Sequence, residues 1–516
     1  MLPFGAGPVT NGEFVPASPS AHDRDIFDAT LAEIEWAAQR AAIDRRTFLR
    51  GAGGVAAALT VFNLAACSGK SPRSASRSTS SSSTSTSTST STSTRPTVTG
   101  PGGSFTVPTT ADVPACAHAL GGDGEFIFDV HSHHVMPNGP WRRTAPDTTR
   151  LVGSMLPQCD ASDPFECADR AAYLHAMFLS SDTTIAMLTD VPNSGPNDAP
   201  LPFSDALATQ QFAAQLTRDG ASRILVHNVI APNFGDLHER LDGMEATAAT
   251  RHVAAFKMYT AWGPNRHGFS LDDPAIGLPV VQKAHDLGVK VIVAHKGLPL
   301  VDFDASHNGP EDIVAVSRVF PDMNFVVFHS NWDPNHTEGP YNAASPIGID
   351  RLLAALDAHR VPPNSNVWVD IAAVWRSLLH RPDQAAHMLG KLLTRVGEER
   401  VMWGTDAVWY GSPQPQIMAF RAFQITAELQ DRYRYPALTD SVKRKIFGLN
   451  AARLFGVDPE ATRCALARDP LSDARPAALH LHESGAVPSA WRPNGPTTRR
   501  EMLRWLAAPA TRWTPA

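Results

Sequence analysis

Short, continuous runs of apolar, β-branched and aromatic residues recur along the chain after residue 124. Each run is followed by a polar or Gly/Pro-containing turn and then by a stretch with helical spacing. Continuous apolar runs are typical of strands buried on both faces, and intervals of about thirty to sixty residues leave room for a helix in every crossover. The eight runs are Phe126–Val130, Thr184–Leu188, Ile224–Val229, Ala254–Tyr259, Val289–Ala294, Asn324–Phe328, Val367–Ile371 and Val401–Gly404.

Eight β-α units of this kind predict a closed parallel barrel, a (β/α)8 barrel of the TIM type, over residues 123–458. A doubly wound open sheet is the alternative. No Gly-x-Gly-x-x-Gly segment opens a helix after the first run, which favours the barrel. The remaining residues, 459–516, are expected to form a C-terminal extension that either wraps the barrel or aids oligomerisation.

The N-terminal part of the chain lacks the strand pattern. Arg45 and Arg46 precede a Gly/Ala-rich apolar stretch, Gly51–Ala66, which ends at Cys67. This segment resembles a twin-arginine signal peptide that ends in a lipobox, whereas an amphipathic helix packed on the domain is the alternative. The apolar stretch is shorter than the roughly twenty residues that a stable membrane-spanning helix needs. The resemblance implies that residues 1–67 direct export and that Cys67 carries a lipid, which would hold the protein on the outer face of the cytoplasmic membrane or in the cell envelope.

The next segment, residues 68–122, is rich in Ser and Thr up to Thr94 and then in Pro and Gly. Such a composition cannot bury enough apolar area to offset the entropy lost on ordering. We therefore expect a disordered linker between the export signal and the barrel.

Composition limits the class of partner. The chain has 516 residues, 43% of them apolar, a formal net charge of -6 and no block rich in Lys or Arg. This balance gives no electrostatic reason to expect nucleic acid or an acidic membrane surface as a partner, so a small-molecule substrate is expected and a homo-oligomer stays open. The five cysteines are too few and too scattered for a disulfide framework, although Cys159 and Cys167 can pair in an oxidising compartment.

Metal-ligand residue types follow several of the predicted strands, at the end where barrel enzymes build their sites. The first run leads into His131 and His133, whose side chains point to the same side because side chains alternate along a strand. His295 and His329 follow the fifth and sixth runs, and Asp406 follows the eighth. Barrel closure brings the eighth strand beside the first, so the Asp406 carboxylate is expected to reach an ion held by the two histidines.

This His-x-His pair, the two later histidines and the final aspartate resemble the amidohydrolase superfamily. The nearest branch is the amidohydrolase-2 group of metal-dependent hydrolases that are similar to aminocarboxymuconate-semialdehyde decarboxylase. Residues 443–455 also resemble the closing helix of that group. The resemblance implies that His131, His133 and Asp406 bind a divalent metal, with zinc favoured and His295 as a further ligand. His329 would then orient or deprotonate the attacking water, or join the metal shell if there are two ions.

Lys257 lies in the fourth predicted strand, where some members of the superfamily carry a carboxylated lysine that bridges two metals. A salt-bridged lysine that lines the pocket is an equally good interpretation, since a buried lysine needs some such partner. The number of metal ions, one or two, depends on which interpretation holds.

Aromatic residues follow strands four, six, seven and eight and are candidates for the rim of a pocket that holds an apolar substrate, with packing under loops as the alternative. Arg376 could clamp a substrate carboxylate, but a solvated arginine at a helix start is the favoured interpretation. The aromatic candidates are Trp262, Trp332, Trp375, Trp409 and Tyr410.

These features predict a metal-dependent hydrolase of a small-molecule amide, ester or lactone. Imidazole and carboxylate ligands suit zinc, which lowers the pKa of a bound water to about 7, and Asp406 can accept the proton of that water as general base. A non-oxidative decarboxylase of the same family is one alternative. A non-catalytic ligand-binding lipoprotein is the other.

Overall fold

The computed structural model describes most of the expected barrel and part of each flank. The expected signal peptide with Cys67, residues 68–96 of the linker and residues 484–516 of the extension lie outside the described residues. Within the described part of the chain, no helix is both long and apolar enough to cross a membrane. The described ranges are 97–99, 102–106, 125–157, 159, 161–216, 222–300, 302–466 and 470–483.

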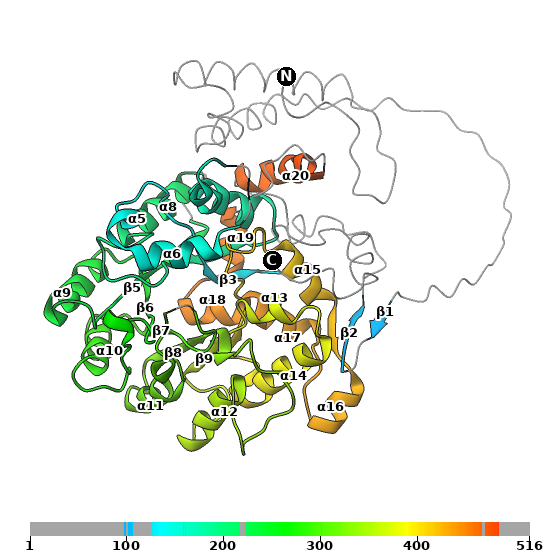
Figure 1. Cartoon of the computed structure of the whole chain (residues 1–516). Coiled ribbons are helices and arrows are strands. Elements are labelled where there is room, and N and C mark those ends of the chain that lie inside the picture. Colours follow the sequence, from blue (N-terminus) through cyan, green and yellow to red (C-terminus); the bar gives the residue numbers. More distant parts are fainter. Residues whose placement is uncertain are drawn as a thin grey trace, which may run out of the picture.

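Eight parallel strands form the centre of the molecule and pair in chain order (Figure 1). A bridge between Ser132 and Ala407 and a hydrogen bond from the Asp406 amide to the His131 carbonyl, 2.8 Å long, bring the last strand beside the first. The predicted (β/α)8 barrel is therefore confirmed. Its strands are β3 (Phe128–Ser132), β4 (Ile185–Leu188), β5 (Ile224–Val229), β6 (Val253–Met258), β7 (Val291–His295), β8 (Asn324–Phe328), β9 (Val367–Asp370) and β10 (Val401–Met402).

Two strand ends differ from the prediction in a way that matters for the site. The strand β3 continues to Ser132, and β7 continues to His295, so His131 and His295 lie within strands instead of after them. The sequence pattern ends each run at its last apolar residue, whereas the backbone ladder continues through polar residues that face the barrel mouth.

Helices surround the barrel in the crossovers between strands. Their buried positions follow the helical period, as in α12, where Ile349, Leu352, Leu353 and Leu356 are all buried. The helices are α5 (Trp141–Thr144), α6 (Pro146–Met155), α7 (Arg170–Leu174), α8 (Phe203–Gln215), α9 (Leu237–Ala248), α10 (Gly277–Asp286), α11 (Glu311–Val319), α12 (Ile349–Ala358), α13 (Val374–Leu378), α14 (Pro382–Leu392), α15 (Gln414–Ala422), α16 (Ala427–Tyr433), α17 (Asp440–Arg444), α18 (Asn450–Phe455), α19 (Pro459–Leu466) and α20 (Pro470–Glu483).

Alternate strand residues pack into two different layers. In β8, Phe325 and Val327 join the layer between the strands and the helices, whereas Val326 and Phe328 join a cluster that includes residues of β3, β4, β6, β7 and β10. This alternation is what a barrel with a filled interior requires, and it explains why the sequence shows continuous apolar runs. The polar residues at the strand ends therefore lie at one end of a barrel interior that is filled mainly by apolar side chains.

Part of the segment predicted as a disordered linker forms two paired strands, so that prediction is wrong for residues 97–99 and 103–106. Strand β1 (Thr97–Thr99) pairs antiparallel with β2 (Gly103–Thr106), which pairs in turn with β11 (Phe423–Ile425). The short runs of Thr, Val and Phe favour strands, and Gly102, with a φ of +87°, permits the tight turn between them. The composition of the whole segment gave no sign of these two strands.

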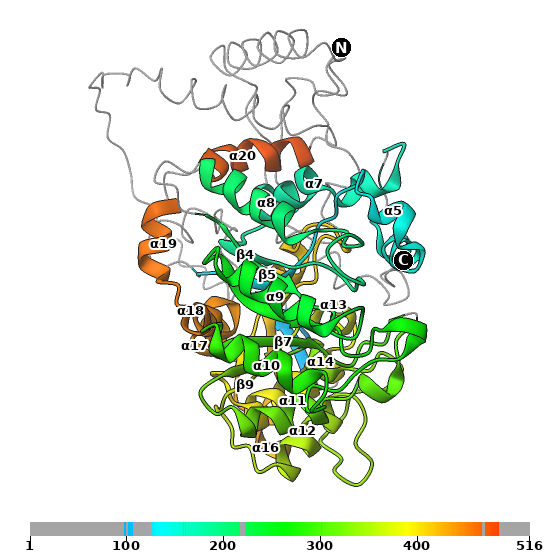
Figure 2. The same cartoon turned by 90° about the vertical axis from the view of Figure 1, so that its left-hand side faces the viewer.

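The described part of the C-terminal extension packs against the barrel. Helix α20 lies across α7 and α8 (Figure 2), where Leu471 and Ala474 meet Tyr173 and Leu174 in one apolar cluster. This arrangement agrees with an extension that wraps the barrel.

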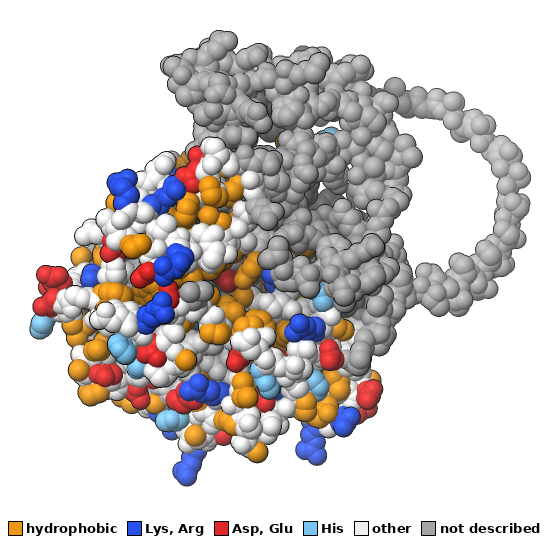
Figure 3. Space-filling view, in the orientation of Figure 1, with side chains coloured by type: hydrophobic (Ala, Val, Ile, Leu, Met, Phe, Trp, Pro, Cys, Tyr) orange, Lys and Arg blue, Asp and Glu red, His pale blue; other side chains and the backbone are white. Residues whose placement is uncertain are grey.

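One disulfide, Cys159–Cys167, lies in the segment between β3 and β4, with 5.8 Å between its Cα atoms. Cys167 is buried, and the carbonyl of the next residue, Ala168, accepts a hydrogen bond from the Val135 amide just beyond the His-x-His pair. On the face seen in Figure 3, basic and acidic side chains are interspersed instead of gathered into one area.

Candidate metal centre

Two imidazoles at the end of β3 lie side by side at the mouth of the barrel. The ring centroids of His131 and His133 are 5.1 Å apart, and each residue is at most 2% exposed. The alternation of side chains along a strand explains why residues two apart face the same side.

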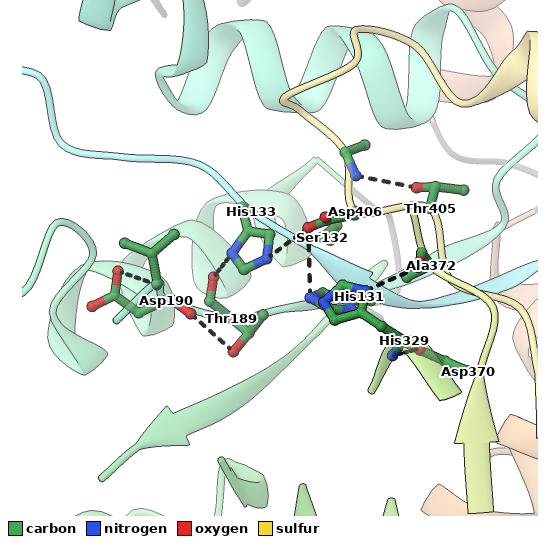
Figure 4. A network of polar contacts seen from close by, with 12 residues as sticks. His131, Ser132, His133, Thr189, Asp190, His329, Asp370, Ala372, Thr405 and Asp406 are labelled. Atoms are coloured by element: carbon green, nitrogen blue, oxygen red, sulfur yellow. Dashed lines mark hydrogen bonds and ion pairs between the residues drawn. The ribbon is translucent and has the colours of Figure 1, made fainter. Parts of the chain in front are cut away.

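The Asp406 carboxylate approaches both rings from the loop after β10 (Figure 4). Its Oδ1 atom lies 3.2 Å from His133 Nε2 and 3.6 Å from His131 Nε2. These three residues offer ligand atoms that all lie within 4.8 Å of one another. The structure thus brings together the three residues that the sequence argument treated as the core of a metal site.

The other ring nitrogens are held by the protein. His133 Nδ1 donates to the Thr189 carbonyl at 2.8 Å, since a carbonyl can only accept, and His131 Nδ1 contacts Asp370 Oδ2 at 2.9 Å. Such partners fix the orientation and tautomer of a metal-binding histidine. Burial lowers the pKa of both histidines, so both rings are neutral at pH 7.

Asp129 joins the first and last strands beneath this group. Its carboxylate accepts hydrogen bonds from the His131 amide at 3.0 Å, from the Thr405 amide at 3.1 Å and from the Thr405 hydroxyl. Burial raises the pKa of Asp129 to about 7, although these hydrogen bonds lower it. Asp129 therefore sets the spacing between His131 on one strand and Asp406 beside Thr405 on the other.

His329 packs next to His131, with 4.8 Å between their ring centroids. Its Nδ1 donates to the Ala372 carbonyl at 2.9 Å, and its amide donates to Asp370 Oδ1 at 2.6 Å. His329 Nε2 is consequently the nitrogen left free, and burial lowers the pKa of this ring to about 4.

Strained backbone is concentrated at this mouth. His329, Ala373 and Asp406 have φ values of 59°, 57° and 60°, a region that non-glycine residues seldom adopt. Each such residue costs on the order of 1–3 kcal/mol, and such strain is typical of functional sites.

His295 lies outside the three-residue group, so its role as a further ligand stays a prediction. Its Nε2 donates to the Leu298 carbonyl at 3.0 Å, and its ring lies 4.5 Å from that of His329. The loop after β7 thus engages Nε2, and Nδ1 is the ring nitrogen that can still accept a proton or bind a cation.

Lys257 is fully buried on β6, and its Nζ lies 3.5 Å from His131 Nε2. The ammonium also lies 4.5 Å from the ring centroid of Tyr259 and 4.7 Å from that of Phe328. Burial lowers the pKa of Lys257 to about 7. No carboxylate of the described residues forms an ion pair with it, so the salt-bridged interpretation lacks a direct partner here.

The aromatic candidates divide into two sets. Trp409 packs its ring 5.4 Å from that of His133, and the Tyr410 ring lies under the guanidinium of Arg376. Trp262 packs with Tyr259 in a separate cluster at the mouth. These three lie near the histidine group.

The other two aromatic candidates do not face the site, so their assignment to a substrate pocket is wrong. Trp375 is fully buried, donates its indole N–H to the Gln416 carbonyl at 2.9 Å and packs against Phe420 and Phe423. Trp332 belongs to the core between the strands and the helices. Position after a strand does not reveal which way a side chain turns, and both turn into the helical layer.

Sequence reasoning missed two carboxylates of the site, Asp129 and Asp370. Both are fully buried acids within strands, Asp129 as the second residue of β3 and Asp370 as the last residue of β9. A charged residue in a strand buried on both faces needs a partner, and that signal could have identified them.

The family of the chain follows from its sequence. A family model described as Amidohydrolase (Amidohydro_2) matches residues 195–457, which is just over half of the chain. The chain belongs to this amidohydrolase family. The match includes Lys257, His295, His329 and Asp406 and begins after the strand that carries His131 and His133. No curated protein matches this amidohydrolase.

Several solved structures resemble the amidohydrolase at low identity. An uncharacterized TIM-barrel protein from Bordetella bronchiseptica has a TM-score of 0.42 and 13% identity, over 64% of this chain and 99% of that one. A 5-carboxyvanillate decarboxylase from Novosphingobium aromaticivorans with bound manganese has a TM-score of 0.41 and 14% identity, over 66% and 99%. A putative metal-dependent hydrolase from Lactobacillus casei has a TM-score of 0.36 and 14% identity, over 64% and 95%. At these TM-scores the reactions of the neighbours are not transferred to this chain.

Proposed function

We propose that this amidohydrolase is a metal-dependent enzyme that hydrolyses an amide, ester or lactone bond of a small molecule. The observation that carries the proposal is the convergence of His131, His133 and Asp406 in a buried group at the barrel mouth. Membership of the amidohydrolase family also supports a metal-dependent enzyme.

The donor set fits a divalent cation. With His133 neutral and its proton on Nδ1, the lone pair of Nε2 points at an Asp406 oxygen 3.2 Å away, so two acceptors face each other. In a buried site this arrangement is unfavourable unless a cation lies between them. His131 Nε2 points to the same oxygen, which gives the cation a third ligand.

Zinc is the ion that we favour, because imidazole and carboxylate donors both suit it, although a manganese ion would also accept this set. When bound, such an ion supplies Lewis acidity, which lowers the pKa of water to about 7 and polarises a substrate carbonyl. Two ions would require a carbamate on Lys257. Intact mass of gently purified protein tests this, because a carbamate adds carbon dioxide to the mass and an unmodified Lys257 excludes the bridge.

The protein itself supplies the proton acceptors. His329 is neutral, and with Nδ1 fixed by the Ala372 carbonyl it presents Nε2 as an acceptor. The carboxylate of Asp406 is a second acceptor within the same group. Either residue can hold the proton of an attacking water and return it to the leaving group. His295, packed on His329, holds the ring of His329 in place.

Non-oxidative decarboxylation is the second candidate. It is favoured by two cationic side chains without a carboxylate partner among the described residues, Lys257 and Arg376, which could face a substrate carboxylate. The same metal ligands would serve either reaction.

The two reactions differ in what becomes of water. Metal-loaded protein is to be screened with lactones, esters, amides and aromatic acids in water enriched in oxygen-18. Hydrolysis predicts heavy oxygen in the acid product, whereas carbon dioxide release without incorporation would select the decarboxylase.

The role of His329 is tested by substitution. His329→Gln should reduce kcat at least 100-fold, whereas the exposed control His252→Gln should not. Equal activity of both variants would exclude the role of His329.

Export through residues 1–67 and lipidation at Cys67 remain part of the proposal. The Cys159–Cys167 disulfide supports it, because disulfides persist mainly in oxidising compartments. Fractionation of cells that express the full chain tests this proposal: a Cys67→Ser variant should leave the membrane fraction, and retention of that variant would contradict lipidation.

A further inference from the structure

Arg376, near the metal centre, is a cation that has no anionic partner among the residues that the structure describes. It lies in α13, just after β9, and its guanidinium carbon is 3.9 Å from the centroid of the Tyr410 ring. The side chain is half-buried instead of solvated, which differs from the favoured sequence interpretation. Among the described residues no carboxylate or carbonyl forms a hydrogen bond or ion pair with it.

Two other buried arginines of this protein contact carboxylates. Arg421 contacts Asp182 and Glu125, and Arg475 contacts Asp182 from the opposite element. Withdrawing a guanidinium from water is unfavourable unless an anion compensates it. Burial lowers the pKa of Arg376, and only Tyr410 and Asp406 oppose that effect.

The position of this guanidinium connects it with the reacting groups. Tyr410 is four residues beyond Asp406 in the same loop, and the residue between them that packs on His133 is Trp409. Arg376 is therefore connected to the candidate metal ligands through the loop that carries Asp406, Trp409 and Tyr410. The Asp406 carboxylate is close enough to influence its pKa but does not contact it.

We propose that Arg376, supported by the Tyr410 ring, binds a carboxylate group of the substrate. A guanidinium presents a planar fork that matches a carboxylate with two parallel hydrogen bonds, and stacking on Tyr410 fixes the plane of that fork. The proposal rests on the proposed function for its substrate class: a small organic acid whose carboxylate is anchored at Arg376 while its amide, ester or lactone carbonyl reaches the metal group.

The experiment uses binding to the metal-free protein, so that neither activity nor coordination of a carboxylate by a metal enters the result. Benzoate is the probe, and benzamide is its neutral counterpart of the same shape. Calorimetric titration of both compounds is carried out on the full chain after chelation of metal, with circular dichroism as a check that each variant is folded.

The proposal predicts saturable binding of benzoate and at least tenfold weaker binding of benzamide. Arg376→Met should weaken benzoate binding at least tenfold, and Arg376→Lys should give an intermediate loss because a lysine lacks the fork. Arg266→Met, at an exposed arginine of another loop at the mouth, should bind benzoate like the wild type.

Absence of benzoate binding, equal binding of the two compounds, or undiminished binding to Arg376→Met would overturn the proposal. None of these results depends on turnover or on metal content. A protein that binds benzoate through Arg376 but holds no metal would leave this subsite standing and reject the proposed function.

Discussion

At the scale of single residues, the site depends on carboxylates that hold the ligands in place. Asp129 accepts hydrogen bonds from the His131 amide and from the amide and hydroxyl of Thr405. Asp370 accepts hydrogen bonds from His131 Nδ1 and from the His329 amide. The His-x-His pair and the distant aspartate could be predicted because their residue types indicate metal chemistry. Their supporting carboxylates could not be placed with the same arguments, since an acid in an apolar run shows only that a partner exists.

Replacement of Asp129 tests this supporting role. Asp129→Asn keeps the shape of the side chain but turns one acceptor into a donor that faces other donors. We expect metal affinity to fall about 10- to 100-fold, the range typical of residues that orient ligands. Competition with a fluorescent zinc chelator measures the affinity. Unchanged affinity in a folded variant would show that Asp129 only stabilises the barrel.

His134 gives the molecule a sensitivity to acid. The ring is buried beside Thr209, with 3.0 Å between Nε2 and the hydroxyl oxygen, and burial lowers its pKa to about 3. The unfolded chain binds a proton at this residue below about pH 6.5, whereas the folded chain does not until about pH 3. Stability from His134 is therefore fully present above pH 6.5 and is lost as the pH falls through this window.

The expected size of this loss is about 2 kcal/mol between pH 7 and pH 5. Urea unfolding of the wild type and of His134→Gln at both pH values measures it as the difference between the two proteins. The comparison with the variant is needed because other buried groups also change stability with pH. Asp190, for example, has a pKa raised to about 8, so its contribution to stability rises as the pH falls. Equal losses in both proteins would refute the role of His134.

At the scale of elements, the strands could be predicted closely and the flanking segments could not. The runs Ile224–Val229 and Asn324–Phe328 coincide with β5 and β8, because burial on both faces leaves an unmistakable apolar pattern. The hairpin of β1 and β2 is different. Its second strand, β2, pairs with β11, more than three hundred residues away, and no local pattern contains that information.

Helix α20 owes its position to a buried ion cluster. The Asp182 carboxylate contacts Arg475 of α20 at 2.5 Å, and it also contacts Arg421 and Gln414 of α15. The ion pair between helix and barrel is shielded from solvent, since the side chains of Arg475 and Asp182 are 5% and 3% exposed. The cluster therefore joins the C-terminal extension to the barrel.

Removal of the charge at Asp182 should be costly. Asp182→Asn leaves the buried guanidinium of Arg475 without a counter-charge and Arg421 with Glu125 alone, and we expect the free energy of unfolding to fall by about 3–5 kcal/mol. The matched control is Asp163→Asn, which breaks the partly exposed pair with Arg142 and should cost under about 1 kcal/mol. Urea unfolding measures the free energy of unfolding of both variants. Similar losses in the two variants would contradict a stabilising role for the ion cluster.

At the scale of the whole molecule, closure of the barrel creates the site. His131 and Asp406 are 275 residues apart in the sequence, yet the bond between the Asp406 amide and the His131 carbonyl places them on adjacent strands. The architecture predicted this convergence, because the last strand of a barrel lies beside the first. The architecture could not predict that the loop after β7 would hold His295 through the Leu298 carbonyl.

The metal content of the purified protein tests the central claim most directly. Elemental analysis of gently handled full-length protein should find at least one divalent transition metal per chain. Asp406→Asn should retain less than a tenth of it, whereas Asp147→Asn, at a carboxylate whose side chain is 65% exposed, should match the wild type. A wild type without such an ion, or an Asp406→Asn variant that keeps it, would contradict the convergence of His131, His133 and Asp406 on one cation.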